Sequence, residues 1–412
     1  MKVSVLTLGC RVNQSESAII EGNLSKRGWS LVGLSDYPDY CIVNTCTVTG
    51  KSDYQSRQLI RRALRKGARV IVTGCYAQRS PEDIKKINDN IVIIRNNDKL
   101  NIISMLSNID ERITFIPIRR SRPYLKIQDG CNLSCTFCAV PLARGRSRSV
   151  EIPEVIRQAH IIEAGDHKEV VLTGIHLGSY GHDLEPKVKL SNLLKILLKR
   201  TKISRIRLSS LEVKEVDSEL IELFQEERIC KHIHLPLQSG DDTILKQMGR
   251  TYTTHFYTSI INNIIRRVPN ISIGTDIIVG FPGEGRREFL NTKALLDFLP
   301  ITYMHIFPFS PRPNTPASKM GMQISSIIKK ERLSELKSLN DRKKKKYMLS
   351  QIDRTLDIII EEKCGESTSI GTSSNYLRVR VPSKGHHKKD LIKVSVTGIQ
   401  GGLLTGDAIE SL

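Results

Sequence analysis

Three cysteines lie close together in the stretch QDGCNLSCTFCAVP (residues 128–141), in the pattern C-x3-C-x2-C. Thiolates are typical ligands of zinc and of iron–sulfur clusters, and both centres normally take four protein ligands. No fourth cysteine or histidine follows at short spacing, which argues against zinc. Three thiolates, from Cys131, Cys135 and Cys138, would hold three irons of a 4Fe–4S cluster. The fourth iron would then be open to a substrate or a cofactor.

Three other cysteines each follow an expected β-strand. Cys10 follows KVSVLTLG, Cys46 follows YCIVNT and Cys75 follows ARVIVTG. Ligands of open α/β sheets bind outside the carboxyl ends of the strands, so these thiols should meet at one edge. The alternative is that each is a buried packing residue, as single cysteines often are. Their equivalent positions on three strands favour a second metal site.

The elements that position these cysteines fall into three regions. Residues 1–112 alternate strand-like and helix-like runs, which predicts a parallel α/β domain. A second alternating series over residues 120–347 gives about six βα units, fewer than the eight of a closed barrel, and predicts a partial (β/α)6 TIM-like barrel. Short strands over residues 348–412 predict a small antiparallel, OB-like β-barrel. The arginine-rich segment Asp110–Pro123, with two prolines, is interpreted as a linker.

Composition narrows the class of protein. Lys and Arg total 63 against 43 Asp and Glu, a net charge of +20, which indicates an anionic partner such as nucleic acid; a solvated basic surface is the alternative. We find no apolar run of about 18 residues and no signal peptide, and therefore expect a cytoplasmic protein that does not bind membranes. Disulfides are rare in that compartment. We interpret Cys41, Cys230 and Cys364 as packing residues.

The C-x3-C-x2-C pattern is the signature of radical S-adenosylmethionine enzymes, and the chain resembles their methylthiotransferase family from end to end. The resemblance rests on the motifs LGCRVNQSES, VNTCTVT, GCYAQ, DGCNLSCTFCAVPLARGRSRS, RLSSLEV, HLPLQSGDDTILKQMGRTYT, TDIIVGFPGE and FPFSPRPNTPASKM. The segments TLGCRVNQ and CAVPLARGRSRS are most similar to the branch that acts on N6-threonylcarbamoyladenosine in tRNA. The C-terminal unit resembles a TRAM domain, which is an RNA-binding module.

This resemblance implies a tRNA methylthiotransferase that inserts a methylthio group at C2 of N6-threonylcarbamoyladenosine-37. It assigns Cys131, Cys135 and Cys138 to the radical 4Fe–4S cluster, which binds S-adenosylmethionine at its open iron. It assigns the other three strand-end thiols to an auxiliary 4Fe–4S cluster that carries the sulfur. Partners would be tRNA and a low-potential electron donor such as flavodoxin or ferredoxin, and we expect a monomer.

Three other functions remain open: methylthiolation of N6-isopentenyladenosine-37 in tRNA, methylthiolation of an aspartate in a ribosomal protein, and a non-catalytic iron–sulfur or RNA-binding role. The net charge of +20 favours RNA over the ribosomal protein. The complete set of cysteines argues against a protein that only binds.

Further residues at expected strand ends are candidates for cofactor contacts, with an ordinary βα turn as the alternative in each case. The backbone of Thr173 and Gly174, in LTGIHLGSYG, is a candidate for holding the methionyl amine, because glycine permits close approach. Gln238 and Ser239, in LPLQSGDD, are candidates for bonding the ribose or the carboxylate. We interpret Asp276 and Glu284 as structural.

Candidate RNA contacts come from basic and aromatic residues, and a solvated basic face is the alternative for each charged one. Strand NYLRVRV places Arg378 and Arg380 on one face, with Tyr376 available to stack on a base. Arg144 and Arg146 follow the cysteine loop and are candidates for steering an anionic substrate. The basic run Lys343–Lys346 lies at the end of a long helix expected over residues 323–349.

Overall fold

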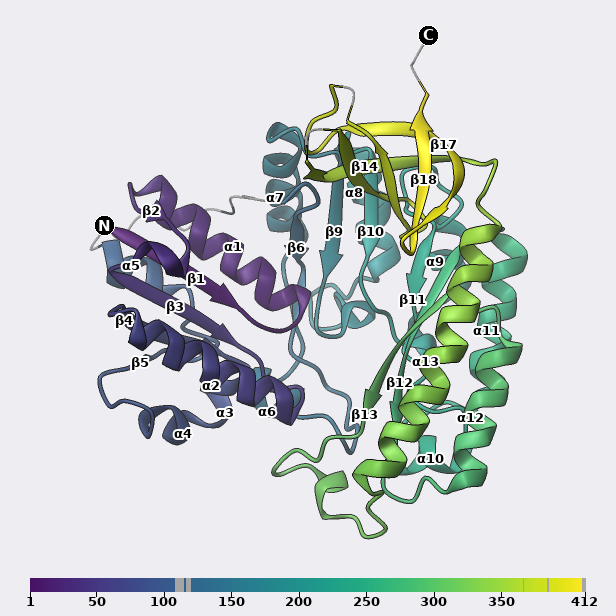
Figure 1. Ribbon diagram of the computed structural model, residues 1–412, viewed down its shortest axis with the longest axis horizontal. Helices are drawn as coiled ribbons and strands as arrows, with labels where there is room; N and C mark the ends of the chain where they lie inside the picture. The colour runs from purple at the N-terminus through teal and green to yellow at the C-terminus, as the bar shows by residue number, and fades with distance from the viewer. Residues whose placement is uncertain (108–114, 116–119, 366, 384, 410–412) are drawn as a thin grey trace.

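The computed structural model describes residues 1–107, 115, 120–365, 367–383 and 385–409. Figure 1 shows an N-terminal α/β domain on the left, a partial barrel in the centre and a small β-barrel above it. Most of the segment predicted as a linker, residues 110–114 and 116–119, lies outside the described residues. The predicted domain boundaries stay predictions.

The N-terminal domain is a five-stranded sheet in the order β2-β1-β3-β4-β5, and every pair is parallel, as predicted. Side chains alternate between its faces. Ile42 and Ile71 pack with α1 and α5 on one face, while Val43 and Val72 pack with α2 on the other. The elements are β1 (Lys2–Thr7), α1 (Arg11–Lys26), β2 (Ser30–Leu31), η1 (Leu34–Asp36), β3 (Tyr40–Thr45), α2 (Gly50–Arg65), β4 (Arg69–Gly74), α3 (Cys75–Arg79), α4 (Pro81–Lys85), β5 (Val92–Ile93) and α5 (Asn101–Ser107).

The central domain contains six parallel strands, β6, β9, β10, β11, β12 and β13, in two three-stranded sheets. Parallel bridges, Ile206 to Ile229 and Ser210 to His234, connect β10 with β11 and join the two sheets. This arrangement confirms the predicted partial barrel. The barrel strands are β6 (Tyr124–Lys126), β9 (Glu169–Thr173), β10 (Arg205–Leu208), β11 (His232–His234), β12 (Ser272–Val279) and β13 (Tyr303–Pro308).

Helices follow the barrel strands and cover their outer side (Figure 1). They are α7 (Ile152–Ala164), α8 (Leu190–Arg200), α9 (Ser218–Leu223), α10 (Asp242–Gln247), α11 (Thr254–Arg267), α12 (Arg286–Phe298) and α13 (Ser326–Leu349), with η2 (Leu177–Ser179), η3 (Val213–Glu215) and η4 (Pro316–Lys319) in the loops. The loop after β6 carries the short antiparallel pair β7 (Gln128–Asp129) and β8 (Arg148–Ser149), with α6 (Val140–Arg144) between them. Glu284 is buried against Arg332, which confirms its structural interpretation.

The C-terminal unit is a closed five-stranded barrel in the order β14-β15-β16-β18-β17, which confirms the predicted small β-barrel. All its pairs are antiparallel except β16 with β18. A closed ring with an odd number of strands cannot alternate direction throughout, so one pair has to be parallel. Its strands are β14 (Thr355–Cys364), β15 (Thr368–Ser373), β16 (Arg378–Pro382), β17 (Leu391–Gln400) and β18 (Leu403–Ala408).

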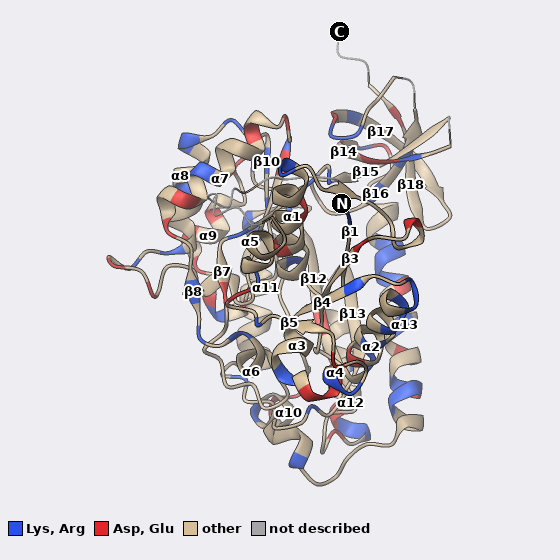
Figure 2. Ribbon diagram, turned by 90° about the vertical axis from the view of Figure 1, so that its left-hand side faces the viewer, with Lys and Arg blue, Asp and Glu red and all other residues tan. Residues whose placement is uncertain are grey.

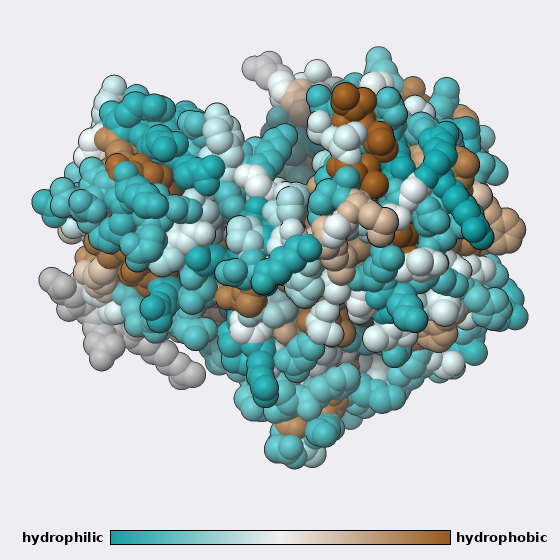
Figure 3. Space-filling model, turned by 90° about the horizontal axis from the view of Figure 1, so that it is seen from below, coloured by the Kyte–Doolittle hydropathy of each residue, from teal (hydrophilic) through white to brown (hydrophobic). Residues whose placement is uncertain are grey.

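Two surface observations bear on partners. Within the described ranges, no helix combines the length and the apolar character needed to cross a bilayer. The face shown in Figure 3 is mainly hydrophilic, with hydrophobic residues in small separate patches.

Cys41 and Cys230 are buried, as predicted for packing residues, but Cys364 is exposed. That interpretation of Cys364 is wrong because the last residues of β14 extend beyond the barrel core.

Candidate active site

The cysteines at the strand ends of the N-terminal sheet lie where the sequence predicts them. Cys10, Cys46 and Cys75, hereafter the strand-end cysteines, follow β1, β3 and β4 within three residues and line one central cavity of about 630 Å³. Close packing shapes this edge. A side chain at Gly9, whose φ is +105°, would come within 3.1 Å of Cys46 Sγ. Glycine is therefore required beside the first thiol.

Burial raises the pKa of two of the thiols at this edge, those of Cys10 and Cys46. Burial raises the pKa of Cys46 to about 11. Burial also raises the pKa of Cys10, although the nearby positive charge of Arg144 opposes the shift. Metal binding requires thiolates, so it has to displace the thiol protons. The site therefore suits a metal centre, because its positive charge would offset the free-energy cost of deprotonating the thiols.

The second group, Cys131, Cys135 and Cys138, hereafter the loop cysteines, lies between β7 and α6. Hydrogen-bond donors point at each sulfur: the backbone N–H of Leu133 lies 3.4 Å from Cys131 Sγ, and that of Val140 lies 3.4 Å from Cys138 Sγ. A guanidinium nitrogen of Arg250 lies 3.2 Å from Cys135 Sγ. Donors to sulfur stabilise thiolates and tune the potential of a bound iron–sulfur cluster.

The two groups of cysteines open toward the same region of the molecule. Cys135 lines a side cavity of about 210 Å³ that is distinct from the central cavity. His176 and Glu212 line both cavities, which places the two spaces next to each other. The structure therefore brings the strand-end cysteines to the central cavity and Cys135 of the loop cysteines to the cavity beside it.

The spacing of the sulfurs favours clusters over single zinc ions. Across the described part of the chain, His234, Asp276 and His305 are the only three ligand-type side chains whose ligand atoms all lie within 4.8 Å of one another. Neither group of cysteines is packed that tightly. Tetrahedral zinc with Zn–S bonds of about 2.3 Å would place its sulfurs about 3.8 Å apart. Neither group therefore forms a ready zinc site, whereas three thiolates are a donor set that can hold three irons of a 4Fe–4S cluster.

Of the four residues predicted to contact S-adenosylmethionine, three reach the central cavity: Thr173, Gly174 and Gln238. Ser239 does not, because it is fully buried and its hydroxyl lies 3.3 Å from that of Thr292. The hydroxyl of Ser209 is buried at the cavity wall and has no hydrogen-bond partner within the described residues. A polar ligand in the cavity would satisfy it, and we infer no other role from its surroundings.

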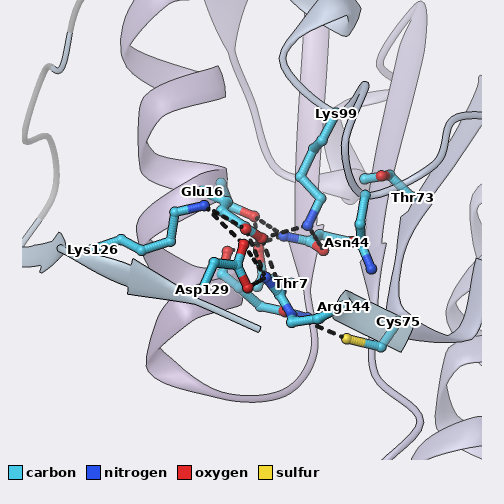
Figure 4. A network of polar contacts seen from close by, with 12 residues as sticks. Thr7, Glu16, Asn44, Thr73, Cys75, Lys99, Lys126, Asp129 and Arg144 are labelled. Carbon is cyan, nitrogen blue, oxygen red and sulfur yellow. Dashed lines mark hydrogen bonds and ion pairs between the residues drawn. The ribbon is translucent and has the colours of Figure 1, made fainter. Parts of the chain in front are cut away.

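Arg144 connects the two sites, and its side chain is buried rather than exposed to solvent. Its guanidinium lies 2.8 Å from Oε1 of Glu16 and 3.0 Å from Oδ1 of Asp129, and its Nε lies 3.4 Å from Cys75 Sγ. Figure 4 shows this network between α1 and the cysteine loop. Opposing the cost of burial, three basic side chains hold the pKa of Glu16 well below its usual range: Lys99, Lys126 and Arg144. Arg144 therefore joins the domains and cannot meet RNA at the surface.

The other predicted RNA contacts occupy different places. Arg146 and Arg378 are exposed and Arg380 is half-buried. Tyr376 lies between the C-terminal barrel and the central one, stacked on His232 with ring centroids 4.4 Å apart. Figure 2 shows Lys and Arg along α13, but the amine of Lys343 bonds the carbonyls of Asp297 and Leu299 and so caps a neighbouring helix.

Five further residues of the central barrel line the cavity and are called the third wall here, beside the strand-end cysteines and the predicted S-adenosylmethionine contacts. The sequence analysis singled out only Asp276 among them and interpreted it as structural. The third wall consists of His234, Asp276, Tyr303, His305 and Phe307. His234 Nε2 and His305 Nδ1 lie 3.0 and 3.1 Å from Asp276 Oδ1. Burial favours protonation of Asp276, but these two contacts lower its pKa. Alternation in HIH and YMHIF was the available signal, because every second residue of a strand faces the same side.

Comparisons with known proteins agree with this geometry. Residues 2–95 match a family described only as an uncharacterized protein family, UPF0004, and residues 125–296 match the radical SAM superfamily. Threonylcarbamoyladenosine tRNA methylthiotransferase MtaB of Aquifex aeolicus is 39% identical over 88% of this chain and 93% of the relative. The chain belongs to the radical S-adenosylmethionine methylthiotransferase family.

Other members of the methylthiotransferase family are similar over comparable lengths. MtaB of Bacillus subtilis is 36% identical over 92% of this chain and 89% of the relative. The tRNA-2-methylthio-N(6)-dimethylallyladenosine synthase of Alkaliphilus oremlandii is 31% identical over 87% and 82%. Among solved structures, the radical S-adenosylmethionine methyltransferase TsrM of Kitasatospora setae superposes with a TM-score of 0.56, covering 77% of each chain at 14% identity. That likeness supports the fold alone.

Proposed function

We propose that this methylthiotransferase replaces the hydrogen at C2 of N6-threonylcarbamoyladenosine-37 in tRNA with a methylthio group. The observation that carries the proposal is that the strand-end cysteines line the central cavity while Cys135, one of the loop cysteines, lines the cavity beside it. One open coordination position suits radical generation and the other suits sulfur delivery. Similarity to several MtaB proteins over most of the chain supports the choice of adenosine derivative.

The chain would hold its cofactors in three places. The loop cysteines would bind the radical 4Fe–4S cluster, and the strand-end cysteines would bind an auxiliary one. Thr173, Gly174 and Gln238 would line the space for S-adenosylmethionine, and Ser209 would add a hydroxyl. When bound, the radical cluster with S-adenosylmethionine would supply the radical that removes the C2 hydrogen, the auxiliary cluster would supply the sulfur, and a second S-adenosylmethionine would supply the methyl group of that sulfur.

The protein itself contributes position and surroundings. The bonds from Arg144 to Glu16 and Asp129 fix the N-terminal sheet against the cysteine loop, and so fix the separation of the two sites. The ion pair of Arg250 with Glu212 holds the side cavity together beside Cys135. Such preorganisation matters because a radical reaction needs its partners in near-attack geometry and shielded from water.

Partners follow from the same chemistry. A tRNA substrate suits the net charge of +20, and the arginines of β16, exposed Arg378 and half-buried Arg380, would meet its backbone. A low-potential donor such as flavodoxin or ferredoxin would supply electrons, and these partners together would place the reaction in the cytoplasm. We propose that the enzyme acts as a monomer, because both cysteine sites are complete within one chain.

Mass spectrometry of nucleosides from bulk tRNA tests the proposal, with a strain lacking the gene compared to its parent. We expect 2-methylthio-N6-threonylcarbamoyladenosine to disappear and the unthiolated nucleoside to accumulate. Loss of the isopentenyl derivative instead would keep the family and contradict the substrate. Unchanged tRNA would contradict the tRNA function and direct attention to ribosomal protein.

A further inference from the structure

Arg11 is a charged side chain of the central cavity to which the preceding function assigns no task. It is the first residue of α1 and directly follows the first strand-end cysteine. It is half-buried and lines the cavity together with Tyr303 and His305 of the third wall. Arg11 therefore lies beside the strand-end cysteines, on the side of the cavity opposite the central barrel.

Arg11 differs from the other arginine of this cavity in its partners. Arg144 is paired with two carboxylates, Glu16 and Asp129. The contacts of Arg11 are both with Tyr376: one guanidinium nitrogen lies 2.9 Å from the phenol oxygen, and the guanidinium carbon lies 5.7 Å from the ring centroid. Among the residues that the structure describes, no carboxylate pairs with Arg11. A half-buried guanidinium that no carboxylate neutralises is available to bind an anionic ligand.

The acidic groups of the cavity are already occupied and do not compete for Arg11. Among the described residues, two with carboxylates line the space, Glu212 and Asp276. Glu212 is ion-paired with Arg250. Asp276 accepts from two imidazoles, as described for the third wall. The charge of Arg11 is thus left for a ligand.

Tyr376 holds Arg11 in a fixed place because the C-terminal barrel is anchored beside it. Arg207, fully buried in the central barrel, bonds the backbone carbonyls of Ser373 at 2.9 Å and Ser374 at 3.0 Å. The same guanidinium lies 5.3 Å from the Tyr376 ring, which also contacts the rings of His232 and Tyr303. Residues of all three domains therefore meet at Arg11.

From this geometry we infer that Arg11 binds the carboxylate of the threonylcarbamoyl group on the target adenosine, with Tyr376 as its positioning residue. The inference rests on the proposed function and deepens it. The threonyl group ends in a free carboxylate, whereas an isopentenyl group is apolar and gives an arginine nothing to bind. Arg11 would then select the substrate, since a buried polar site left unpaired penalises the ligand that lacks the matching group.

An RNA phosphate has the same anionic chemistry, so the test must separate the two sources. Three anticodon stem-loop RNAs do this: one with N6-threonylcarbamoyladenosine, one with the threonine carboxylate replaced by a carboxamide, and one with unmodified adenosine. All three carry the same phosphates. Their affinities are measured anaerobically by fluorescence anisotropy with enzyme that contains its reconstituted clusters.

For the wild-type enzyme we expect the carboxylate RNA to bind more tightly than the carboxamide RNA by about 10- to 100-fold, the usual range for a hydrogen bond to a charged group. Arg11→Gln should remove this preference and leave the affinity for unmodified RNA unchanged. Arg11→Lys should keep part of it. Arg62→Gln, at an exposed position of α2, removes one charge away from the cavity and should keep all of it.

Equal weakening of all three RNAs by Arg11→Gln would assign the residue to a phosphate and overturn the inference, and so would an unchanged preference. Iron content and circular dichroism confirm that each variant is folded and loaded. If wild-type enzyme forms no methylthio product from the carboxylate RNA, the proposed function fails first and the inference fails with it.

A kinetic comparison tests the role of Tyr376. Tyr376→Phe keeps the ring and removes the hydroxyl that Arg11 bonds. We expect a several-fold rise in KM for the carboxylate RNA with little change in kcat, and no effect on the affinity for unmodified RNA. A change in kcat alone, or an equal effect on all three RNAs, would contradict the positioning role.

Discussion

The two cysteine sites reach similar donor sets by different routes. The loop cysteines occupy eight consecutive residues, 131–138. Two of their sulfurs accept from nearby backbone N–H groups, and the third accepts from Arg250, 115 residues away in sequence. The strand-end cysteines are separated by 36 and 29 residues, and only the parallel order β1-β3-β4 brings them together. The first site belongs to a loop, whereas the second belongs to a sheet and depends on its register.

This difference has a consequence for how the sites fail. A compact loop can retain its metal when distant packing changes, because its ligands move together. A site built on three strands loses its geometry when the sheet or its neighbours shift. Arg144 joins the two, since it follows the loop cysteines in sequence and bonds Cys75 in space. We therefore expect the two cysteine sites to serve different steps of the reaction, while a change at Arg144 destabilises the surroundings of both.

The largest effect should come from the loop cysteines. Cys135→Ala removes one ligand of the radical cluster, and we expect neither 5′-deoxyadenosine nor methylthio product to form. Iron per reconstituted chain should fall from about eight to about four, because each 4Fe–4S cluster holds four irons. Measurements are iron analysis and chromatography of the reaction mixture. Retained 5′-deoxyadenosine formation would show that these cysteines do not hold the radical cluster.

Cys75→Ala should separate the two sites. Iron should again fall by about half, since one 4Fe–4S cluster would be lost. The methylthio product should vanish, but 5′-deoxyadenosine should still form from S-adenosylmethionine and reductant. The buried neighbour Cys41→Ala is the matched control, because it removes a thiol of the same sheet without removing a strand-end ligand. Loss of 5′-deoxyadenosine in Cys75→Ala would contradict the division of labour.

These two sites also show how far sequence reasoning reaches. The loop cysteines could be found from spacing alone, and the strand-end cysteines from their place after apolar runs, because both signals are local. The six-stranded barrel and the terminal β-barrel follow from alternation and turn residues in the same way. Arg144 was misplaced because its burial depends on Glu16, 128 residues away. No local pattern contains that contact.

The side chain of Ser239 was misplaced for a related reason. A strand end predicts that a residue lies near the active-site edge, but not which way its hydroxyl points, and Thr292 on α12 decides that. Arg11 was missed because its partner Tyr376 comes from another domain. Elements are encoded in short stretches of sequence, while contacts between domains are encoded in pairs of distant residues.

A moderate loss of stability is expected for variants of Arg144, which contacts residues beside both cysteine sites. Arg144→Met removes one partner that Glu16 and Asp129 share, while Lys126 still pairs with both. Breaking a buried ion pair on one side costs about 3 kcal/mol, and the remaining lysine should keep the loss of stability at or below that value. Arg146→Met, at the exposed neighbouring arginine, should change stability by less than about 0.5 kcal/mol. Urea denaturation of the metal-free chain under reducing conditions measures both.

The effect of Arg144→Met should also depend on pH. The pKa of Glu16 and that of Asp129 are lowered in the folded chain, so their pairing contributes fully at neutral pH and is lost as pH falls through the lowered values. The difference between wild type and variant should therefore shrink in acid. A difference that is small at pH 7, or that grows in acid, would show that Arg144 does not stabilise the junction between the sites.

The smallest effect should come from residues that serve neither site. Arg378 and Arg380 lie on β16 of the terminal barrel, away from all six cysteines, and Arg378 is exposed. If they bind tRNA phosphates, the double variant Arg378→Ala/Arg380→Ala should lower the slope of log affinity against log salt by about 0.7–0.9 for each phosphate that is no longer neutralised. Iron content and the formation of 5′-deoxyadenosine without tRNA should not change, because neither cluster depends on this strand.

Titrations at several salt concentrations with unmodified stem-loop RNA give the slope. An unchanged slope would show that Arg378 and Arg380 do not neutralise tRNA phosphates, and the bond of Tyr376 to Arg11 would then be the contribution of the C-terminal barrel that the structure supports.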